Sequence, residues 1–172
     1  MPEQAASRSL IRIVDGAARV VEDDWIIVED GAEWDGLPHR LLPLNLALAR
    51  RAQLQTARPI GVWLAPSEDP ADAIELFSCI DVIGVRFPSF TDGRGYSTAA
   101  LLRSRHGWRG ELRAIGDVLQ DQLFYLRRVG FDSFALRADR DPHQALRAFS
   151  TFSDSYQGSI VPGLPHFHRA QA

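Results

Sequence analysis

Apolar residues recur along the chain with two different periods, and the alternation of these periods predicts the order of the secondary structure. Four short apolar runs typical of strands begin near residues 60, 81, 111 and 133, and a segment with helical spacing follows each of them. The predicted strands are 60–65, 81–87, 111–115 and 133–137. The predicted helices are 42–55, 68–79, 97–107, 116–130 and 141–149.

Capping residues support several of these helices. Ser97 and Asp117 are predicted N-caps, and Gln120 completes a capping box with Asp117. Gly130 is a typical residue at the end of a helix, and the pair Asp141-Pro142 is typical of a helix start.

The repetition is typical of successive βα units with parallel strands. Residues 10–14 (LIRIV) and 25–28 (WIIV) are two further strands that could pair as a hairpin. The predicted fold class is therefore α/β: four successive βα units form a mostly parallel sheet, preceded by a short N-terminal strand pair. The sheet is either half-barrel-like or a small doubly wound sheet. Because the strands are mostly apolar, the pattern favours helices over both faces. Half a barrel exposes two strand edges; the N-terminal strand pair could cover one, and a homodimer the other.

Length and composition predict one α/β domain over residues 1–157, followed by an extended or disordered tail over 158–172. The formal charge of −3 argues against a nucleic-acid or membrane-surface binder, although all 19 basic residues are arginine. No run is long enough to span a bilayer, and residues 1–10 lack a signal-peptide pattern, so the expected location is cytoplasmic. The single cysteine, Cys79, lies in an apolar run and predicts a buried structural thiol. The sequence thus indicates no intrinsic redox centre and no metal site, and leaves any cofactor unknown.

Ligands bind at the carboxyl ends of parallel strands, so the residues just after each strand are the candidates for a site. The longest and most polar of these segments is FPSFTDGRGYS, residues 87–97. Together with neighbouring strand ends it gives the predicted ligand-binding set, which is Arg86, Asp92, Gly93, Arg94, Gly95, Tyr96, Ser97 and Arg137.

These residue types are suited to recognition of a small anion. Two glycines would let backbone amides approach the ligand, and the start of a helix favours negative charge. Arginines would add bidentate hydrogen bonds to an oxyanion or a carboxylate. The alternative is that the segment is only a rigid turn, because Asp-Gly is a common turn dipeptide and Arg–Asp pairs often fix loops.

Two carboxylates, Asp92 and Asp117, are the candidates for a catalytic acid or base, and capping alone would also explain Asp117. A dinucleotide site is a weaker alternative. The string GRGYST has Thr98 in place of the third glycine of the fingerprint, and several residues separate the strand from Gly93.

The stretch 87–137 closely resembles the signature region of a bacterial family known as domain of unknown function 934. The elements that carry the resemblance are D-G-R-G-Y-S, Asp92 to Ser97, and G-D-V-L-x-D-Q-L, Gly116 to Leu123. The resemblance covers roughly residues 40–156. Members of the family are commonly labelled as possible oxidoreductases involved in sulfite reduction, which implies a role in assimilatory sulfur metabolism beside a sulfite reductase.

Three functions are consistent with these observations. The favoured one is an accessory protein of sulfite reduction that binds a small oxyanion or assists the reductase. The second is an interaction module that docks on the reductase. The third is an independent barrel-like enzyme acting on a small anionic substrate. Since the chain has no redox group of its own, direct electron transfer would require a borrowed flavin, nicotinamide or partner cluster.

Overall fold

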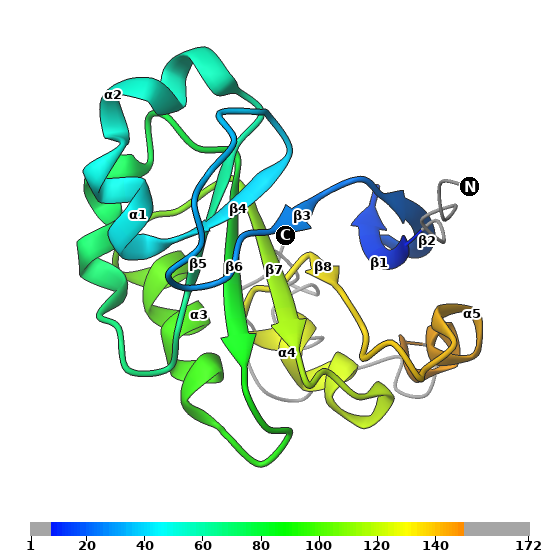
Figure 1. Cartoon of the computed structure of the whole chain (residues 1–172). Coiled ribbons are helices and arrows are strands. Elements are labelled where there is room, and N and C mark those ends of the chain that lie inside the picture. Colours follow the sequence, from blue (N-terminus) through cyan, green and yellow to red (C-terminus); the bar gives the residue numbers. More distant parts are fainter. Residues whose placement is uncertain (1–7, 150–172) are drawn as a thin grey trace, which may run out of the picture.

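The strands of the computed structural model form one curled, eight-stranded sheet, described over residues 8–149 (Figure 1). The strand order across the sheet is β2-β1-β8-β7-β6-β5-β4-β3. The strands are β1 (Arg8–Val14), β2 (Ala17–Asp23), β3 (Ile26–Ile27), β4 (Arg40–Pro43), β5 (Gly61–Leu64), β6 (Val82–Phe87), β7 (Glu111–Gly116) and β8 (Ser133–Phe134). Strands β3 to β8 run parallel, whereas β1 pairs antiparallel with both β2 and β8. The predicted fold class is confirmed, in its half-barrel form; the predicted tail, 158–172, lies outside the described residues.

The N-terminal strand pair exists, but its second strand is not the predicted one. β1 pairs with β2, residues 17–23, through a two-residue turn in which Asp15 and Gly16 both have positive φ, 51° and 79°. This is the conformation of the tight hairpin turns that favour Asp-Gly. The hairpin covers the edge of β8, since Ile11 lies opposite Phe134.

The predicted strand 25–28 instead supplies β3, at the opposite edge of the sheet, where Ile26 pairs with Arg40 of β4. β4 itself lies partly within the predicted helix 42–55. Its residues Leu41 and Leu42 are both buried, and the helical spacing of the leucines that follow conceals the strand in the sequence. Strands β2 and β3 are the edges of the sheet; that a second copy of the chain covers one of them stays a prediction.

Helices pack against one face of the sheet, rather than the two faces that the apolar strands favour. In Figure 1, α1 (Leu44–Ala49), α2 (Arg51–Leu54) and α3 (Arg94–Ser104) stand on one side of the strands, and the blue hairpin lies at the far end. The core of this face joins residues of the strands to residues of α1, α3 and α4 (Leu123–Val129); examples are Leu42, Val62, Leu64, Ile83, Val85, Ala114, Ala47, Ala99, Leu102, Leu123 and Leu126. A smaller cluster lies on the other, concave face: Trp25, Leu41, Trp63, Val82 and Ile115.

Two helix starts differ from the prediction. α3 begins at Arg94, so Gly93 is its N-cap and Ser97 lies exposed within the helix. Ahead of α4 a short 3-10 helix, η3 (Gln120–Gln122), begins after Leu119, whose amide donates to Gln122 Oε1 at 2.9 Å. Asp117 is therefore not a helix cap.

The remaining helices agree with the prediction in place but are short and partly 3-10. α4 ends at Gly130, and the Asp141 carboxylate caps α5 (Pro142–Ala145) by accepting from the His143 amide at 2.8 Å. The other short helices are η1 (Gln55–Ala57), η2 (Pro70–Leu76) and η4 (Leu146–Phe149).

A carboxylate at the start of β6 ties this strand to β5. Asp81 accepts hydrogen bonds from the Arg58 guanidinium and from the Ile60 amide, the latter at 3.0 Å. Burial alone would raise the pKa of Asp81, but these hydrogen bonds outweigh it and the pKa lies below its ordinary value of 3.8.

Replacing Asp81 is expected to make the free energy of unfolding change less as the pH falls into the acid range. Because its pKa is lower in the folded state, ionised Asp81 stabilises the fold above about pH 4, and this contribution disappears as the pH falls through the folded-state pKa. Asp81→Asn should therefore cost about 1–2 kcal/mol at pH 7 and progressively less below pH 4. Urea unfolding from pH 7 to pH 2.5 measures both; a loss that stays constant with pH would contradict this role.

Candidate functional site

A cavity of about 660 Å³ lies on the concave face of the sheet. In a closed barrel, inward-pointing side chains from all the strands fill the interior. Here the sheet curls only part of the way, and the space in front of its inward-pointing side chains stays open. The lining residues are Arg8, Ser9, Asp23, Trp25, Ile27, Leu41, Arg113, Ile115, Gly116, Ala135, Leu136, Arg137, Ala138, Arg140 and Pro142.

The cavity has a buried floor and an exposed mouth. The floor is largely apolar, with Trp25, Leu41 and Ile115 each less than 10% exposed. At the mouth, Arg8 and Arg140 are exposed. The antiparallel register of β1 and β8 brings the start of β1 to the carboxyl end of β8, the end at which a ligand site is expected.

One wall of the cavity is a buried charge network centred on Arg113. This residue is 1% exposed; its Nη1 donates to Asp23 Oδ1 at 2.8 Å, and its Nη2 to Glu111 Oε1 at 2.7 Å. Glu111 also accepts from Arg12 and from the Ser133 hydroxyl, at 2.7 and 2.6 Å. The positive charge of Arg113 is therefore matched by two carboxylates, and the network joins the hairpin to β7 and β8.

At the mouth, Arg137 is held on both sides by acids. It donates to Asp139 at 2.6 and 2.8 Å and to Asp117 at 3.1 Å. The bonds to Asp139 are the main reason that its pKa is raised and that of Asp139 lowered.

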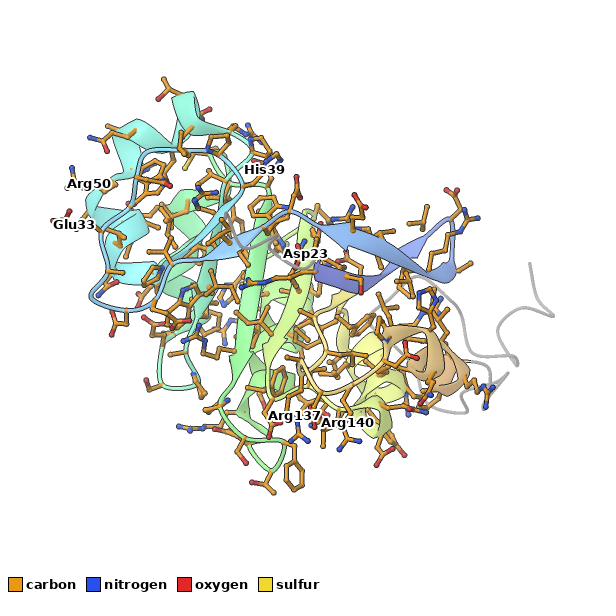
Figure 2. The ribbon with its side chains drawn as sticks, turned by 45° about the vertical axis from the view of Figure 1, so that its right-hand side comes forward. Asp23, Glu33, His39, Arg50, Arg137 and Arg140 are labelled. Atoms are coloured by element: carbon orange, nitrogen blue, oxygen red, sulfur yellow. The ribbon has the colours of Figure 1, made fainter. Side chains whose placement is uncertain are left out.

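The other two arginines of the mouth are less neutralised. Arg140 makes only a long contact of 3.8 Å with Asp139, and Arg8 has no ion pair among residues 8–149. Figure 2 shows Arg137 and Arg140 next to each other at one end of the strands, and Asp23, at the end of the hairpin, at some distance from them.

The segment 87–97 forms its own compact structure. Asp92 accepts three hydrogen bonds from Arg94, through the amide at 3.1 Å, Nε at 3.0 Å and Nη2 at 2.7 Å. The bonds from this guanidinium are the main reason that the pKa of Asp92 is lowered. The pair leaves the Arg94 side chain 61% exposed, and neither residue lines the cavity.

The next residues of the segment pack against the strand that precedes it. A Cβ on Gly95 would lie 2.5 Å from the Phe87 ring, so this glycine is required for close packing of α3 on β6. Tyr96 packs edge-on against the same ring at 5.6 Å, and burial raises the pKa of its hydroxyl. Nothing lies within 4 Å of a Cβ built on Gly93.

The structure brings some of the predicted residues together and separates others. Asp117 contacts Arg137 and also accepts from the Phe90 amide at 2.8 Å, so it joins the segment 87–97 to the mouth. Arg86 lies elsewhere on the concave face, stacked on Trp63 at 3.9 Å and paired with Glu29. Of the predicted ligand-binding residues only Arg137 lines the cavity, and ligand binding by the others stays a prediction.

Five residues that line the cavity were not among the predicted site residues: Arg8, Asp23, Trp25, Arg113 and Arg140. One signal for Arg113 was available: in ELRAI, Glu111 and Arg113 alternate with apolar residues, which is typical of a strand with one polar face. Arg8 and Asp23 enter the site through the β1–β2 hairpin, which the Asp-Gly pair at positions 15 and 16 could have indicated.

Within residues 8–149 no three histidine, cysteine or acidic side chains are grouped so that they could hold a metal ion. In the same part of the chain no helix has the length and apolar character needed to cross a membrane.

Replacing Arg94 is expected to have little effect on folding. Its partner lies two residues away and its side chain is largely exposed, and such pairs contribute little to stability. Arg94→Ala should therefore lower the midpoint of thermal unfolding by less than about 3 °C. A larger drop in a calorimetric scan would show that this arginine is a structural tie.

One family model matches most of the chain. A family model described as "Bacterial protein of unknown function (DUF934)" matches residues 61–167. The match includes D-G-R-G-Y-S and G-D-V-L-Q-D-Q-L, and it starts and ends later than the predicted 40–156. A search of curated proteins finds no match to the chain. Because the family model spans more than half of the 172 residues, the chain belongs to the DUF934 family.

Proposed function

We propose that this protein is an accessory protein of sulfite reduction that binds a small oxyanion at the mouth of the concave cavity. The observation that carries the proposal is that three arginines, Arg8, Arg137 and Arg140, line the same cavity of about 660 Å³. Guanidinium groups at a partly enclosed position bind oxyanions through charge-assisted hydrogen bonds.

The contacts of the three arginines support different roles for them. Asp117 and Asp139 hold Arg137 in place, so it would present its remaining N–H groups in a fixed direction. Arg8 and Arg140 have little neutralising charge among the described residues and would supply most of the attraction. The link to sulfite reduction rests on the resemblance carried by D-G-R-G-Y-S.

A thermal-shift experiment tests the proposal with sulfite, sulfate and phosphate. An anion at about a hundred times its dissociation constant should stabilise the protein by roughly 2.7 kcal/mol and raise the unfolding midpoint by several degrees. Arg140→Ala should abolish this shift. Arg50→Ala is the matched control, because Arg50 is exposed and lies on the opposite side of the molecule (Figure 2).

Arg94→Ala, measured in the same series, separates the two predicted anion sites. A shift that persists in Arg94→Ala and vanishes in Arg140→Ala assigns binding to the cavity. The reverse pattern assigns it to the segment 87–97. Absence of a shift with every anion would overturn oxyanion binding.

A second candidate function is docking on the reductase as an interaction module. It is favoured by two exposed aromatic side chains, Phe90 and Tyr125, which are 53% and 57% exposed. Gln122 lies close to both residues in the structure. Its Nε2 donates to the Phe90 carbonyl at 3.0 Å, and it precedes Tyr125 by less than one helical turn. If Phe90→Ser and Tyr125→Ser release sulfite reductase in a pull-down while Arg140→Ala does not, docking is the better description.

A further inference from the structure

We infer that the cavity accepts an organic oxyacid anion, in which a sulfonate or phosphate group is carried on an apolar or aromatic body, rather than an inorganic oxyanion alone. This inference rests on the proposed function, because it places the anionic group at the same three arginines. It adds that the apolar or aromatic body of the ligand lies over the floor of the cavity.

The first argument is size. A volume of about 660 Å³ lies within the range of pockets that hold drug-sized ligands, roughly 300–1,000 Å³. A sulfite or phosphate ion is only a few times larger than a water molecule, whose share of liquid volume is about 30 Å³. Such an ion at the mouth would leave most of the cavity to water against an apolar floor.

The second argument is the separation of charge from apolar surface. The exposed guanidinium groups are at the mouth, on Arg8 and Arg140, whereas the buried surface behind them comes from Leu41, Ile115 and Trp25. A ligand with an acid at one end and an apolar body at the other would match both. Its body would gain free energy by removing this apolar surface from water.

The third argument is that the buried polar groups of the wall beside the floor need no partner from a ligand. The charge of Arg113 is matched by Asp23 and Glu111, with hydrogen bonds of 2.7 to 2.9 Å. The Trp63 indole, on the same face, donates to the Val28 carbonyl at 2.9 Å. An uncharged body can therefore lie over the floor without leaving a buried charge unpaired.

The test uses a probe of this chemistry and an analogue that lacks its acid. The probe is 1-anilinonaphthalene-8-sulfonate, and the analogue is N-phenyl-1-naphthylamine, which has the same aromatic body without the sulfonate. We expect the sulfonate to bind with one-to-one stoichiometry and at least tenfold more tightly than the analogue. Arg140→Ala should weaken the sulfonate tenfold or more and change the affinity of the analogue less than twofold, whereas Arg50→Ala should change neither.

A variant that fills the floor separates this inference from the proposed function. Ala135 lines the cavity and is only partly buried, so Ala135→Leu should place extra volume where the body would lie. We expect this variant to lose binding of the sulfonate probe at least tenfold while keeping its thermal shift with sulfite.

Each other outcome has a definite meaning. Unchanged probe binding in Ala135→Leu, or a probe that binds no tighter than its uncharged analogue, overturns the inference and leaves oxyanion binding intact. If neither sulfite nor the probe binds the wild-type protein, the proposed function and the inference fail together.

Discussion

Arg113→Leu is expected to destabilise the protein by about 3–5 kcal/mol. The substitution keeps an apolar side chain of useful size in a position that is 1% exposed, but it removes the cation that faces Asp23 and Glu111. These carboxylates are only 11% and 18% exposed. Glu111 keeps its ion pair with Arg12, but Asp23 has no other cation among the described residues, so leaving it ionised carries a large desolvation cost. The free energy of unfolding from urea titration at pH 7 measures the loss.

The matched control is Arg51→Leu, since Arg51 also pairs with a glutamate, Glu75, but at a surface where the two side chains are 52% and 56% exposed. This control should cost less than about 1 kcal/mol. If Arg113→Leu costs no more than its control, the buried network does not hold the hairpin. Adding Asp23→Asn to Arg113→Leu should recover part of the stability, because Asp23 pairs with no other cation among the described residues, whereas Glu111 keeps its ion pair with Arg12.

Gly116→Ala should cost about 3 kcal/mol, for two independent reasons. Gly116 has φ +93°, which strains any residue with a side chain, and a Cβ would contact the carbonyl oxygen of Phe87. That oxygen also accepts from the Asp117 amide at 2.7 Å, so the backbone of β6 cannot move away without losing this bond. Backbone strain at position 116, about 1–2 kcal/mol, and overpacking against Phe87, about 1–3 kcal/mol, both contribute to this loss.

Gly93→Ala is the control for this substitution, because Gly93 has φ −81° and its added Cβ would meet no atom within 4 Å. Its unfolding free energy should stay within about 0.5 kcal/mol of the wild type. The same pair of variants also distinguishes the roles of the two loops at this end of the sheet. Equal losses in Gly93→Ala and Gly116→Ala would contradict the assignment of strain to Gly116.

Three of the parallel strands, β5, β6 and β7, could be predicted from the sequence because each is a largely buried apolar run between helical segments. Strands β5, β6 and β7 lie within one or two residues of their predicted bounds. Polar loops follow the carboxyl ends of the parallel strands, so Asp117 after β7 and Arg137 after β8 were expected at the same end of the sheet. The two side chains are indeed in contact there. The contact between them follows from the neighbouring positions of β7 and β8.

The cavity could not be predicted in this way, because its walls come from pairings between the two ends of the chain. Arg12 and Glu111, for example, are 99 residues apart in sequence and 2.7 Å apart in space. β4 was hidden for a different reason: its four residues continue directly into the apolar spacing of α1. The spacing of apolar residues along the chain predicts neither which strands lie side by side nor where a short strand gives way to a helix.

The insertion of β1 between β2 and β8 also constrains the order in which the protein can fold during synthesis. The hairpin is synthesised before β8, so β1 finds its second partner only when Ser133 and Phe134 have left the ribosome. Bringing β1 and β8 together is slow, because the chain between them loses conformational entropy before the contacts that compensate for this loss are formed. Until then the nascent hairpin presents an open strand edge, and chaperone binding during translation should concentrate on residues 8–23.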